Sequence, residues 1–554
     1  MKIVECVPNF SEGRDAASIK SITDAIESVD GVTLLDVDPG RGANRTVVTF
    51  VGAPGAVEEA AFRAVARASE VIDMSRHQGS HARLGATDVC PFVPVSDVSV
   101  EECIEMARRV GERVGEELSI PVYLYERAAT SEARRNLADI RAGEYEGLEA
   151  RLRDTAWKPD FGPAEFNARS GATVIGVRKF LVAYNLNLNS DSVADARDLA
   201  LSLRERGRLE RDPDGGKVPD GKGGWKRLPG LLEACKAVGW YIPEYGRAQI
   251  SMNLTDHEVT GMHDAFEAAD RLAREKGLRI TGSEIVGLIP LAAVLDSGLY
   301  YLERRGASRG VPDVDVVRSA VQSLGLSEIA PFDPAGRILE LRLAGCGLVS
   351  RTVADFTAEV SAESPAPGGG SVAALAGSLA AALVSMVANL TFTKKGHEDK
   401  REAMEGAAMR AQALRKRLLD AVDRDTEAFN RVMSAFRMAR KADGEKRARK
   451  QAIAEATKGA TRVPLEVMEM SVEVLELALL VAEQGNPGSI TDAGVGGLMG
   501  RACAVGAHYN VLINLQGLDD DAFVEETRSR SAALGQRAEA LAARIDARLR
   551  QSLG

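Results

Sequence analysis

The sequence contains few cysteines. The six of them, spread over 554 residues, are Cys6, Cys90, Cys103, Cys235, Cys346 and Cys503. No two have the spacing of a zinc site or of a disulfide framework. The chain begins MKIVECVPNF, which is typical of a strand and not of a signal peptide. We therefore expect a reduced, cytoplasmic protein without a metal.

The sequence also lacks an excess of positive charge. Its formal net charge is −10 at pH 7. A broad basic face, which binding to a phosphate backbone requires, is not expected, so nucleic acid is not an expected partner. An anionic ligand would have to bind local positive side chains or helix N-termini.

Long apolar runs are scarce. The exception is residues 371–389, SVAALAGSLAAALVSMVAN, which lie between charged stretches. Most of them are Ala, Gly and Ser, which gain little free energy on transfer to lipid. A membrane span is the alternative, but we expect a small-residue helix buried in a tightly packed bundle and no membrane partner.

Regular structure changes character along the chain. Up to about residue 341, short strand-like and helix-like stretches alternate, which favours α/β structure of the split βαβ, ferredoxin-like kind. From residue 353 helical periodicity predicts an all-α helical bundle. We predict α/β subdomains at residues 1–170 and 171–340, a linker at 341–352, and a helical domain at 353–554.

Periodicity also predicts individual elements of the α/β part. Strands are expected at residues 2–7, 32–37, 46–51, 122–125, 249–254 and 279–280, with an extended run at 171–188. Helices are expected at 16–28, 56–68, 100–118, 193–206 and 261–276. Residues 160–170 are typical of a connecting loop, and 212–224 of a surface loop.

Residues 75–90, SRHQGSHARLGATDVC, form the first candidate site. Two of the six histidines, His77 and His81, lie there with Asp88. Histidine is the side chain best suited to move a proton near neutral pH. The alternatives are a pair of surface or capping histidines, or a metal site, for which further ligands would be needed.

Residues 364–371, SPAPGGGS, form the second candidate site. Gly368, Gly369, Gly370 and Ser371 precede the Ala-rich helix. Glycines before a helix let a ligand approach backbone N–H groups, where the helix dipole favours anions. No Gly-Lys-Ser/Thr follows, so no nucleotide is expected. The alternative is a tight turn for helix packing.

Residues 414–436 form the third candidate site. Apolar residues recur there at three- and four-residue steps, and Asp425 falls on the same helix face. Asp423 points about 200° away from it. A carboxyl group on a buried face needs partners or a raised pKa, either of which suits a catalytic role. The alternative is a buried polar contact between helices.

The fourth candidate site consists of residues 485–492, GNPGSITD, and the helix that follows them. Small polar side chains there are suited to the amide-like edge of a pterin, and we expect them to share one pocket. They are Asn486, Ser489 and Asp492, with Asn510 and Asn514 from the helix.

Several separate stretches resemble glutamate formimidoyltransferase: VECVPNFSEGRD, LLDVDPGRGANRTVVTFVG, HARLGATDVCPFVPV, GATVIGVRKFLVAYNLNL and AVGWYIPEYGRAQISMNLTD. The resemblance implies that His81 is catalytic, with His77 as a neighbour. Asp38 and Arg45 lie in matching motifs and are candidates to orient the imidazole and to bind substrate carboxylates; structural ion pairing is their alternative. The family's folate contacts map to Gly162, Pro163, Ala164, Glu165, Phe166, Asn167, Ala168, Arg169, Ser170 and Gly171.

The helical part resembles the cyclodeaminase domain of the bifunctional formimidoyltransferase-cyclodeaminase family. The matching stretches are PAPGGGSVAALAGSLAAALVSMVANLT, VDRDTEAF and HYNVLINL. The resemblance implies a catalytic aspartate in VDRDTEAF without deciding between Asp423 and Asp425; periodicity favours Asp425. Methenyltetrahydrofolate cyclohydrolases share the glycine loop and the aspartate region, so that activity is an alternative.

The resemblance as a whole implies a bifunctional folate enzyme. The formimino group of N-formimino-L-glutamate passes to tetrahydrofolate, and 5-formiminotetrahydrofolate then closes to 5,10-methenyltetrahydrofolate with release of ammonia. Alternatives are a formyl donor for the first domain, and a non-catalytic folate-binding dimerisation scaffold for the second. The implied assembly is a homo-oligomer built from dimers. Charge alone suggests that a polyglutamate tail lies near Lys394, Lys395 and the lysine-containing loop.

Overall fold

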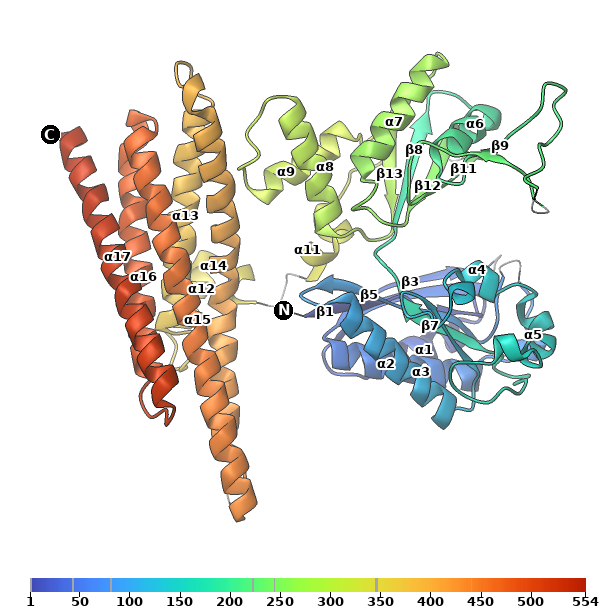
Figure 1. Ribbon diagram of the computed structural model, residues 1–554, viewed down its shortest axis with the longest axis horizontal. Coiled ribbons are helices and arrows are strands. Elements are labelled where there is room, and N and C mark those ends of the chain that lie inside the picture. The colour runs from blue at the N-terminus through green and yellow to red at the C-terminus, as the bar shows by residue number, and fades with distance from the viewer. Residues whose placement is uncertain are drawn as a thin grey trace.

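The computed structural model describes residues 2–41, 44–79, 82–221, 224–243, 245–343, 347–439 and 441–554. An α/β part made of two stacked units lies beside a bundle of long helices (Figure 1). This arrangement confirms the predicted fold class.

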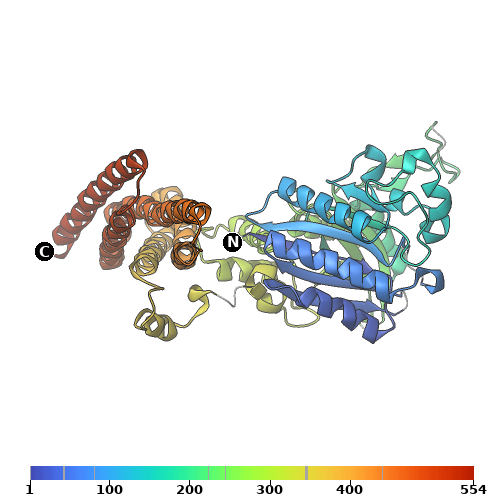
Figure 2. The ribbon, with the colours of Figure 1, turned by 90° about the horizontal axis from the view of Figure 1, so that it is seen from below.

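The first unit is a seven-stranded sheet with its three long helices on one face. Its strands run β1-β4-β2-β5-β7-β6, with β3 paired to β4 at the edge. The helices α1, α2 and α3 lie on one side of this sheet (Figure 2). The elements are β1 (Ile3–Cys6), β2 (Asn9–Phe10), α1 (Ala16–Glu27), β3 (Val32–Gly40), β4 (Arg45–Gly52), α2 (Pro54–Val71), β5 (Thr87–Ser96), α3 (Val100–Glu117), β6 (Val122–Glu126), α4 (Leu137–Ile140), α5 (Glu144–Leu152) and β7 (Thr173–Val177).

Local sequence explains where these helices begin. Asp15 accepts hydrogen bonds from the N–H groups of Ala17 and Ser18 and so caps α1. Ser99 and Glu102 form a capping box at the start of α3. The predicted helices and strands of this unit are therefore present, within a few residues of their expected ends.

The strand β5 was not predicted from the sequence, and neither were β2, α4 and α5 of this unit. Pro91 and Pro94 lie within β5, and proline, which has no N–H to donate, argues against a central strand. Yet β5 pairs antiparallel with β1 and β2 on one side and parallel with β7 on the other. Its place in the sheet depends on these three neighbours and not on its own composition.

The second unit is a four-stranded antiparallel sheet in the order β11-β12-β8-β13. The extended run at 171–188 divides into β7 and β8, which belong to different sheets. The unit comprises β8 (Val182–Leu188), α6 (Val193–Leu203), β9 (Arg208–Leu209), β10 (Arg227–Leu228), β11 (Cys235–Ile242), β12 (Arg247–Leu254), α7 (Met262–Glu275), β13 (Ile280–Val286), α8 (Leu291–Arg304), α9 (Asp313–Ser323), α10 (Pro334–Arg337) and α11 (Leu339–Leu343).

The other face of the first sheet carries α4 and α5 over β5, β6 and β7. The part that these helices leave uncovered meets the second unit. Leu339 of α11 is buried against Leu35 and Val51 of the first sheet. Glu5 of β1 is only 3% exposed. Burial raises its pKa from 4.5 to about 7, an effect that Arg178 reduces and Glu340 reinforces. A carboxyl group that prefers its neutral form therefore lies at the contact between the two units.

Stability should consequently fall as pH rises. Because the pKa of Glu5 is higher in the folded chain, its contribution is complete below about pH 4.5 and is lost through about pH 7. Glu5→Gln, which is neutral throughout, should gain up to about 3 kcal/mol over wild type between pH 5 and pH 8. Thermal unfolding across that range measures this, with the exposed Glu27→Gln as control; parallel profiles for wild type and Glu5→Gln would contradict it.

The bundle consists of α12 (Val353–Val360), α13 (Gly369–Phe392), α14 (Arg401–Phe436), α15 (Asp443–Gln484), α16 (Ile490–Asn514) and α17 (Asp521–Leu553). The helix α13 packs against α14, α15 and α16. By length and composition α13 is apolar enough to cross a membrane, but 67% of its most apolar window is buried, as in a core helix. An added Cβ at Gly377 would lie 2.6 Å from the Cys503 Sγ, so small residues set this close packing.

A loop between α8 and α9 joins the bundle to the α/β part. Ser308 Oγ donates to Asn389 Oδ1 at 2.6 Å, and Asn389 Nδ2 donates to the carbonyl of Gly310 at 2.8 Å. Lys416 of α14 pairs with Asp313 at 2.5 Å. The two parts are thus held by direct polar contacts.

Candidate active sites

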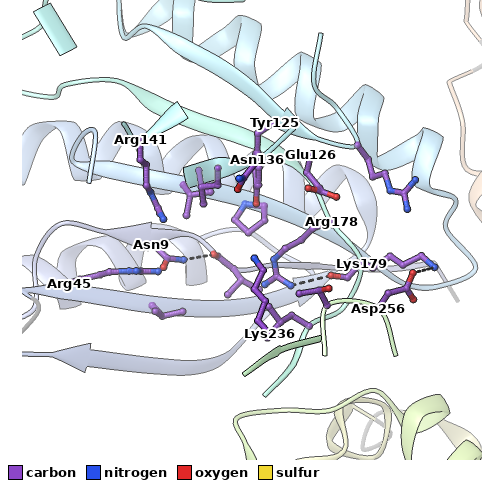
Figure 3. A pocket seen from close by; sticks show the side chains of 18 residues that line it. Asn9, Arg45, Tyr125, Glu126, Asn136, Arg141, Arg178, Lys179, Lys236 and Asp256 are labelled. Carbon is purple, nitrogen blue, oxygen red and sulfur yellow. Dashed lines mark hydrogen bonds and ion pairs between the residues drawn. The ribbon is translucent and has the colours of Figure 1, made fainter. Parts of the chain in front are cut away.

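A cavity of 520 Å³ lies between the two α/β units (Figure 3). Its walls come from the uncovered part of the first sheet, from the residues that follow β6 and β7, and from the ends of β11 and β12. Its cations are Arg45, Arg127, Arg141, Arg178, Lys179 and Lys236, and its carboxylates are Glu126 and Asp256. An anionic ligand is therefore favoured here, although the chain as a whole is acidic.

Strand register places Asp38 relative to this cavity. Val47 of β4 lies opposite Asp38 on β3 and opposite Asn9 on β2. Directly paired residues point to the same face of a sheet. Since Val47 and Asn9 line the cavity, Asp38 is on the cavity's face, one strand further out and exposed.

Arg45, the expected carboxylate-binding residue, lines the cavity and is partly buried. Burial lowers its pKa; Asp88 opposes that effect and Arg141 adds to it. Arg141 in turn binds Asp88, from its Nε to Oδ1 at 3.3 Å and from its Nη2 to Oδ2. Two guanidinium groups thus share the field of one buried carboxylate.

His81 lies outside the described residues. The described residues on both sides of it are fixed beside the cavity cations. Asn44 Nδ2, next to Arg45, donates to the carbonyl of Gln78 at 3.0 Å, and Leu84 N–H donates to Asp88 Oδ1 at 3.0 Å. Segments from both sides of His81 are therefore anchored at the Arg45 and Arg141 end of the cavity.

His77 has both ring nitrogens occupied. Its Nε2 lies 2.8 Å from the carbonyl of Asn44, and Arg83 Nε donates to its Nδ1 at 3.3 Å. Because a guanidinium only donates, Nδ1 is the acceptor and Nε2 carries the proton. Two contacts thus hold the His77 ring in place, and its role as a neighbour of His81 stays a prediction.

The predicted folate segment, residues 162–171, borders the same loop and does not line the cavity described above. The carbonyl of Ser170 accepts from Ala86 N–H at 2.8 Å, and that of Arg169 accepts from Met74 N–H at 2.8 Å. Gly171 adopts a φ of 66°, where an added Cβ would lie 2.2 Å from the carbonyl of Leu84. Glu165 and Ala168 are exposed.

Asp425 belongs to α14, and its carboxyl group lies beside the glycine loop at the start of α13. Gly368 is the N-cap, and the added Cβ of an Ala at Gly370 would lie 2.2 Å from Asp425 Oδ1. Burial raises the pKa of Asp425, and hydrogen bonds from Ser371 partly offset this rise. Asp425 is partly buried on the side of α14 that carries the buried Leu414, Leu418 and Ala421, whereas Phe436, predicted on the same face, is exposed.

Asp423 makes a different contact from Asp425. Its Oδ1 accepts a hydrogen bond from Leu348 N–H at 2.7 Å. It therefore fixes the segment before α12 to α14. The two aspartates, ambiguous in the sequence, are distinguished by these contacts.

The expected shared pocket of asparagines is not formed within this chain. Asn510 lies beside the glycine loop, 3.5 Å from the position of a Cβ on Gly369, and Asn514 donates to the carbonyl of Ala460. Asn486, however, bonds to Thr391 at the opposite end of α13, about 30 Å away at 1.5 Å per residue. Ser489 and Asp492 follow Asn486 there, because α16 runs antiparallel to α13. Lys394, an expected tail contact, donates to Asn486 Oδ1 at 2.5 Å.

Comparison with known proteins identifies the family. The model of the formiminotransferase domain, N-terminal subdomain, matches residues 3–178, that of the formiminotransferase domain matches 183–344, and that of formiminotransferase-cyclodeaminase matches 352–533. The chain is 41% identical over 548 residues to formimidoyltransferase-cyclodeaminase from Mus musculus, covering 98% of each. The chain belongs to the formimidoyltransferase-cyclodeaminase family.

Two shorter relatives each match part of the chain. Glutamate formimidoyltransferase from Streptococcus pyogenes serotype M1 is 41% identical over 302 residues, which are 54% of this chain and 94% of that one. Methenyltetrahydrofolate cyclohydrolase from Methylorubrum extorquens is 41% identical over 196 residues, 35% of this chain and 94% of that one. Relatives of the helical part of the formimidoyltransferase-cyclodeaminase family thus carry two activity names.

Several cavity residues of this family member were not predicted from the sequence. Arg141 follows a four-residue helix, Arg178 follows β7, and Lys236 belongs to β11 of the other unit. None lies in a short motif with a chemical meaning of its own. Only the contact between the two units brings them together.

Proposed function

We propose that this protein transfers the formimino group from N-formimino-L-glutamate to tetrahydrofolate and closes the product to 5,10-methenyltetrahydrofolate, releasing ammonia. The observation that carries this function is the similarity to formimidoyltransferase-cyclodeaminase over 98% of both chains. The cationic cavity and the partly buried Asp425 supply one chemically suitable site in each part.

In the transfer step, N5 of tetrahydrofolate attacks the formimino carbon, and the bond from that carbon to the glutamate nitrogen breaks. N5 loses a proton and the glutamate nitrogen gains one. We assign both transfers to the His81 imidazole, first as base and then as acid. Arg45 and Arg141 are suited to the carboxylates of the donor, and Asp38 to orienting the imidazole.

In the closing step, N10 attacks the formimino carbon attached to N5 and loses its proton to the departing nitrogen, and the C–N bond to that nitrogen breaks once an acid has supplied one further proton. That nitrogen must be protonated to leave as ammonia. We assign the proton to Asp425, because burial raises its pKa and favours the acid form. Gly370 leaves room for the carboxyl group beside the start of α13.

A coupled assay tests the function. Formiminoglutamate and tetrahydrofolate are supplied, and the absorbance of methenyltetrahydrofolate is followed together with ammonia. Equal amounts of both products are expected. The assay is repeated with a formyl donor in place of formiminoglutamate. If neither donor is consumed, the proposed transferase function is wrong.

A cyclohydrolase is the second candidate for the helical domain, favoured by its similarity to the Methylorubrum extorquens enzyme. It would hydrolyse methenyltetrahydrofolate to the formyl form and release no ammonia. Donor consumption without enzyme-dependent ammonia in the same assay would assign this activity. Ammonia that depends on the enzyme would exclude it as the sole activity.

We propose that glutamyl carboxylates of the cosubstrate tail also meet the cavity cations Arg127 and Lys236, which places the tail away from Lys394 and Lys395. A lower KM for polyglutamylated than for monoglutamylated tetrahydrofolate in the transfer step supports this placement. Equal KM values contradict it.

We propose that a second copy of the chain covers the exposed apolar face of α13. Val372, Leu379 and Met386 recur there at seven-residue steps and are 41%, 48% and 39% exposed. The helix carries no charged residue, so an apolar partner is favoured. Leu379→Glu should convert the assembly to smaller species in sedimentation, whereas Val314→Glu, also at an exposed apolar position, should not. Equal sedimentation of the two variants contradicts this.

A further inference from the structure

A buried carboxylate lies behind the cavity cations. Asp88 is the second residue of β5, and its side chain is 1% exposed. It is not among the residues that line the cavity. Both of its oxygens nevertheless bind groups that reach the cavity or the loop that contains His81.

The contacts of Asp88 fix the plane of one guanidinium. Oδ1 accepts from Arg141 Nε at 3.3 Å, and Oδ2 accepts from Arg141 Nη2, which makes a two-point fork. Asp88 is the only carboxylate paired with Arg141 among the described residues. The fork leaves Arg141 Nη1 without a partner in that part of the chain, on a side chain that lines the cavity.

The same carboxylate holds the loop. Leu84 N–H donates to Asp88 Oδ1 at 3.0 Å, three residues after His81. The buried Asp88 carboxylate therefore fixes the position of the Arg141 guanidinium and also holds the backbone at Leu84, close in sequence to His81. A change at Asp88 that keeps an acceptor for Leu84 N–H should act through Arg141, since Asp88 does not reach the cavity itself.

We propose that Asp88 is a positioning residue that holds Arg141 so that its Nη1 edge receives a glutamyl carboxylate. This inference rests on the proposed function. The ligand group occurs both on the formiminoglutamate donor and on the glutamyl tail of the folate. Asp88→Asn keeps an acceptor for Leu84 but replaces one oxygen with an N–H donor, which repels the guanidinium.

Asp160 offers a matched control. It is 9% exposed, pairs with Arg134 at 2.7 Å and accepts from Leu124 N–H at 2.8 Å, so it repeats the burial and the contacts of Asp88. Neither Asp160 nor Arg134 lines the cavity. Asp160→Asn thus loses the same kind of ion pair in the same unit.

The experiment compares full-length wild type, Asp88→Asn, Arg141→Gln, the double variant and Asp160→Asn in the transfer step. Asp88→Asn should raise one KM by about 10-fold or more, as loss of a charge-assisted hydrogen bond predicts. A rise in the KM of formiminoglutamate identifies the donor carboxylate, and a rise in that of tetrahydrofolate identifies the tail. The double variant should be no worse than Arg141→Gln, because Asp88 acts through Arg141.

Three results would overturn the proposal: unchanged KM values in Asp88→Asn, an equal rise in Asp160→Asn, or an Asp88→Asn effect that persists undiminished in the Arg141→Gln background. Circular dichroism and the thermal unfolding midpoint of each variant, compared with those of wild type, report that the α/β part is folded. If wild type transfers no formimino group, the proposed function fails by itself. The carboxylate site is then judged by calorimetric binding of L-glutamate, which Asp88→Asn should weaken about 10-fold and which unchanged binding would refute.

Discussion

Asp425→Asn should lower ammonia release from 5-formiminotetrahydrofolate by about 100-fold or more, while transfer of the formimino group continues. Asn has the same shape as Asp and still accepts the hydrogen bond from Ser371. It has no acidic proton for the departing nitrogen. In the coupled assay, 5-formiminotetrahydrofolate should therefore accumulate without methenyltetrahydrofolate.

Asp423→Asn is the matched control for this result. Its amide oxygen can still accept the hydrogen bond from Leu348 N–H that Asp423 accepts among the described residues. Ammonia release should remain within a few-fold of wild type. If Asp423→Asn stops the reaction and Asp425→Asn does not, the assignment must be exchanged. If neither variant loses activity, the helical domain is the non-catalytic scaffold considered above.

His81→Ala should lower formimino transfer by about 100- to 10,000-fold, the range attributed to a positioned acid–base group. Cyclisation of supplied 5-formiminotetrahydrofolate occurs in the other domain and should be unchanged. Added imidazole should restore part of the transfer rate, because it replaces the missing base; a purely structural histidine would not be rescued in this way.

A comparison with Asn44→Ala separates chemistry from loop placement. Asn44 anchors the loop through Gln78 and Gly13 but carries no titratable group. Asn44→Ala should lower the rate of formimino transfer, and added imidazole should not restore it. Rescue of Asn44→Ala, or none for His81→Ala, would count against His81 as the acid–base group.

Local signals were sufficient for much of the fold. The capped helices α1 and α3 and the strands β1 and β4 could be predicted, because their periodicity and capping residues lie within a few positions of one another. Much of the buried side of α14 was predictable for the same reason, whereas the contacts of Asp423 and Asp425 were not, since both aspartates are partly buried. The family resemblance, likewise, rests on short contiguous motifs.

Other features arise only from tertiary contacts. The strand β5 is central because of its partners, despite two prolines. Asn486 and Asn510 are separated because α16 runs antiparallel to α13. Arg141 and Asp88 meet across 53 residues of chain.

The sequence by itself determined the order of the elements, the division into an α/β and a helical part, and the residue types available for proton transfer, because each depends on neighbours along the chain. Only the tertiary structure decided which cations line the cavity and which aspartate lies beside the glycine loop. Both depend on side chains that are distant in sequence and are brought together when the hydrophobic faces of sheets and helices are buried.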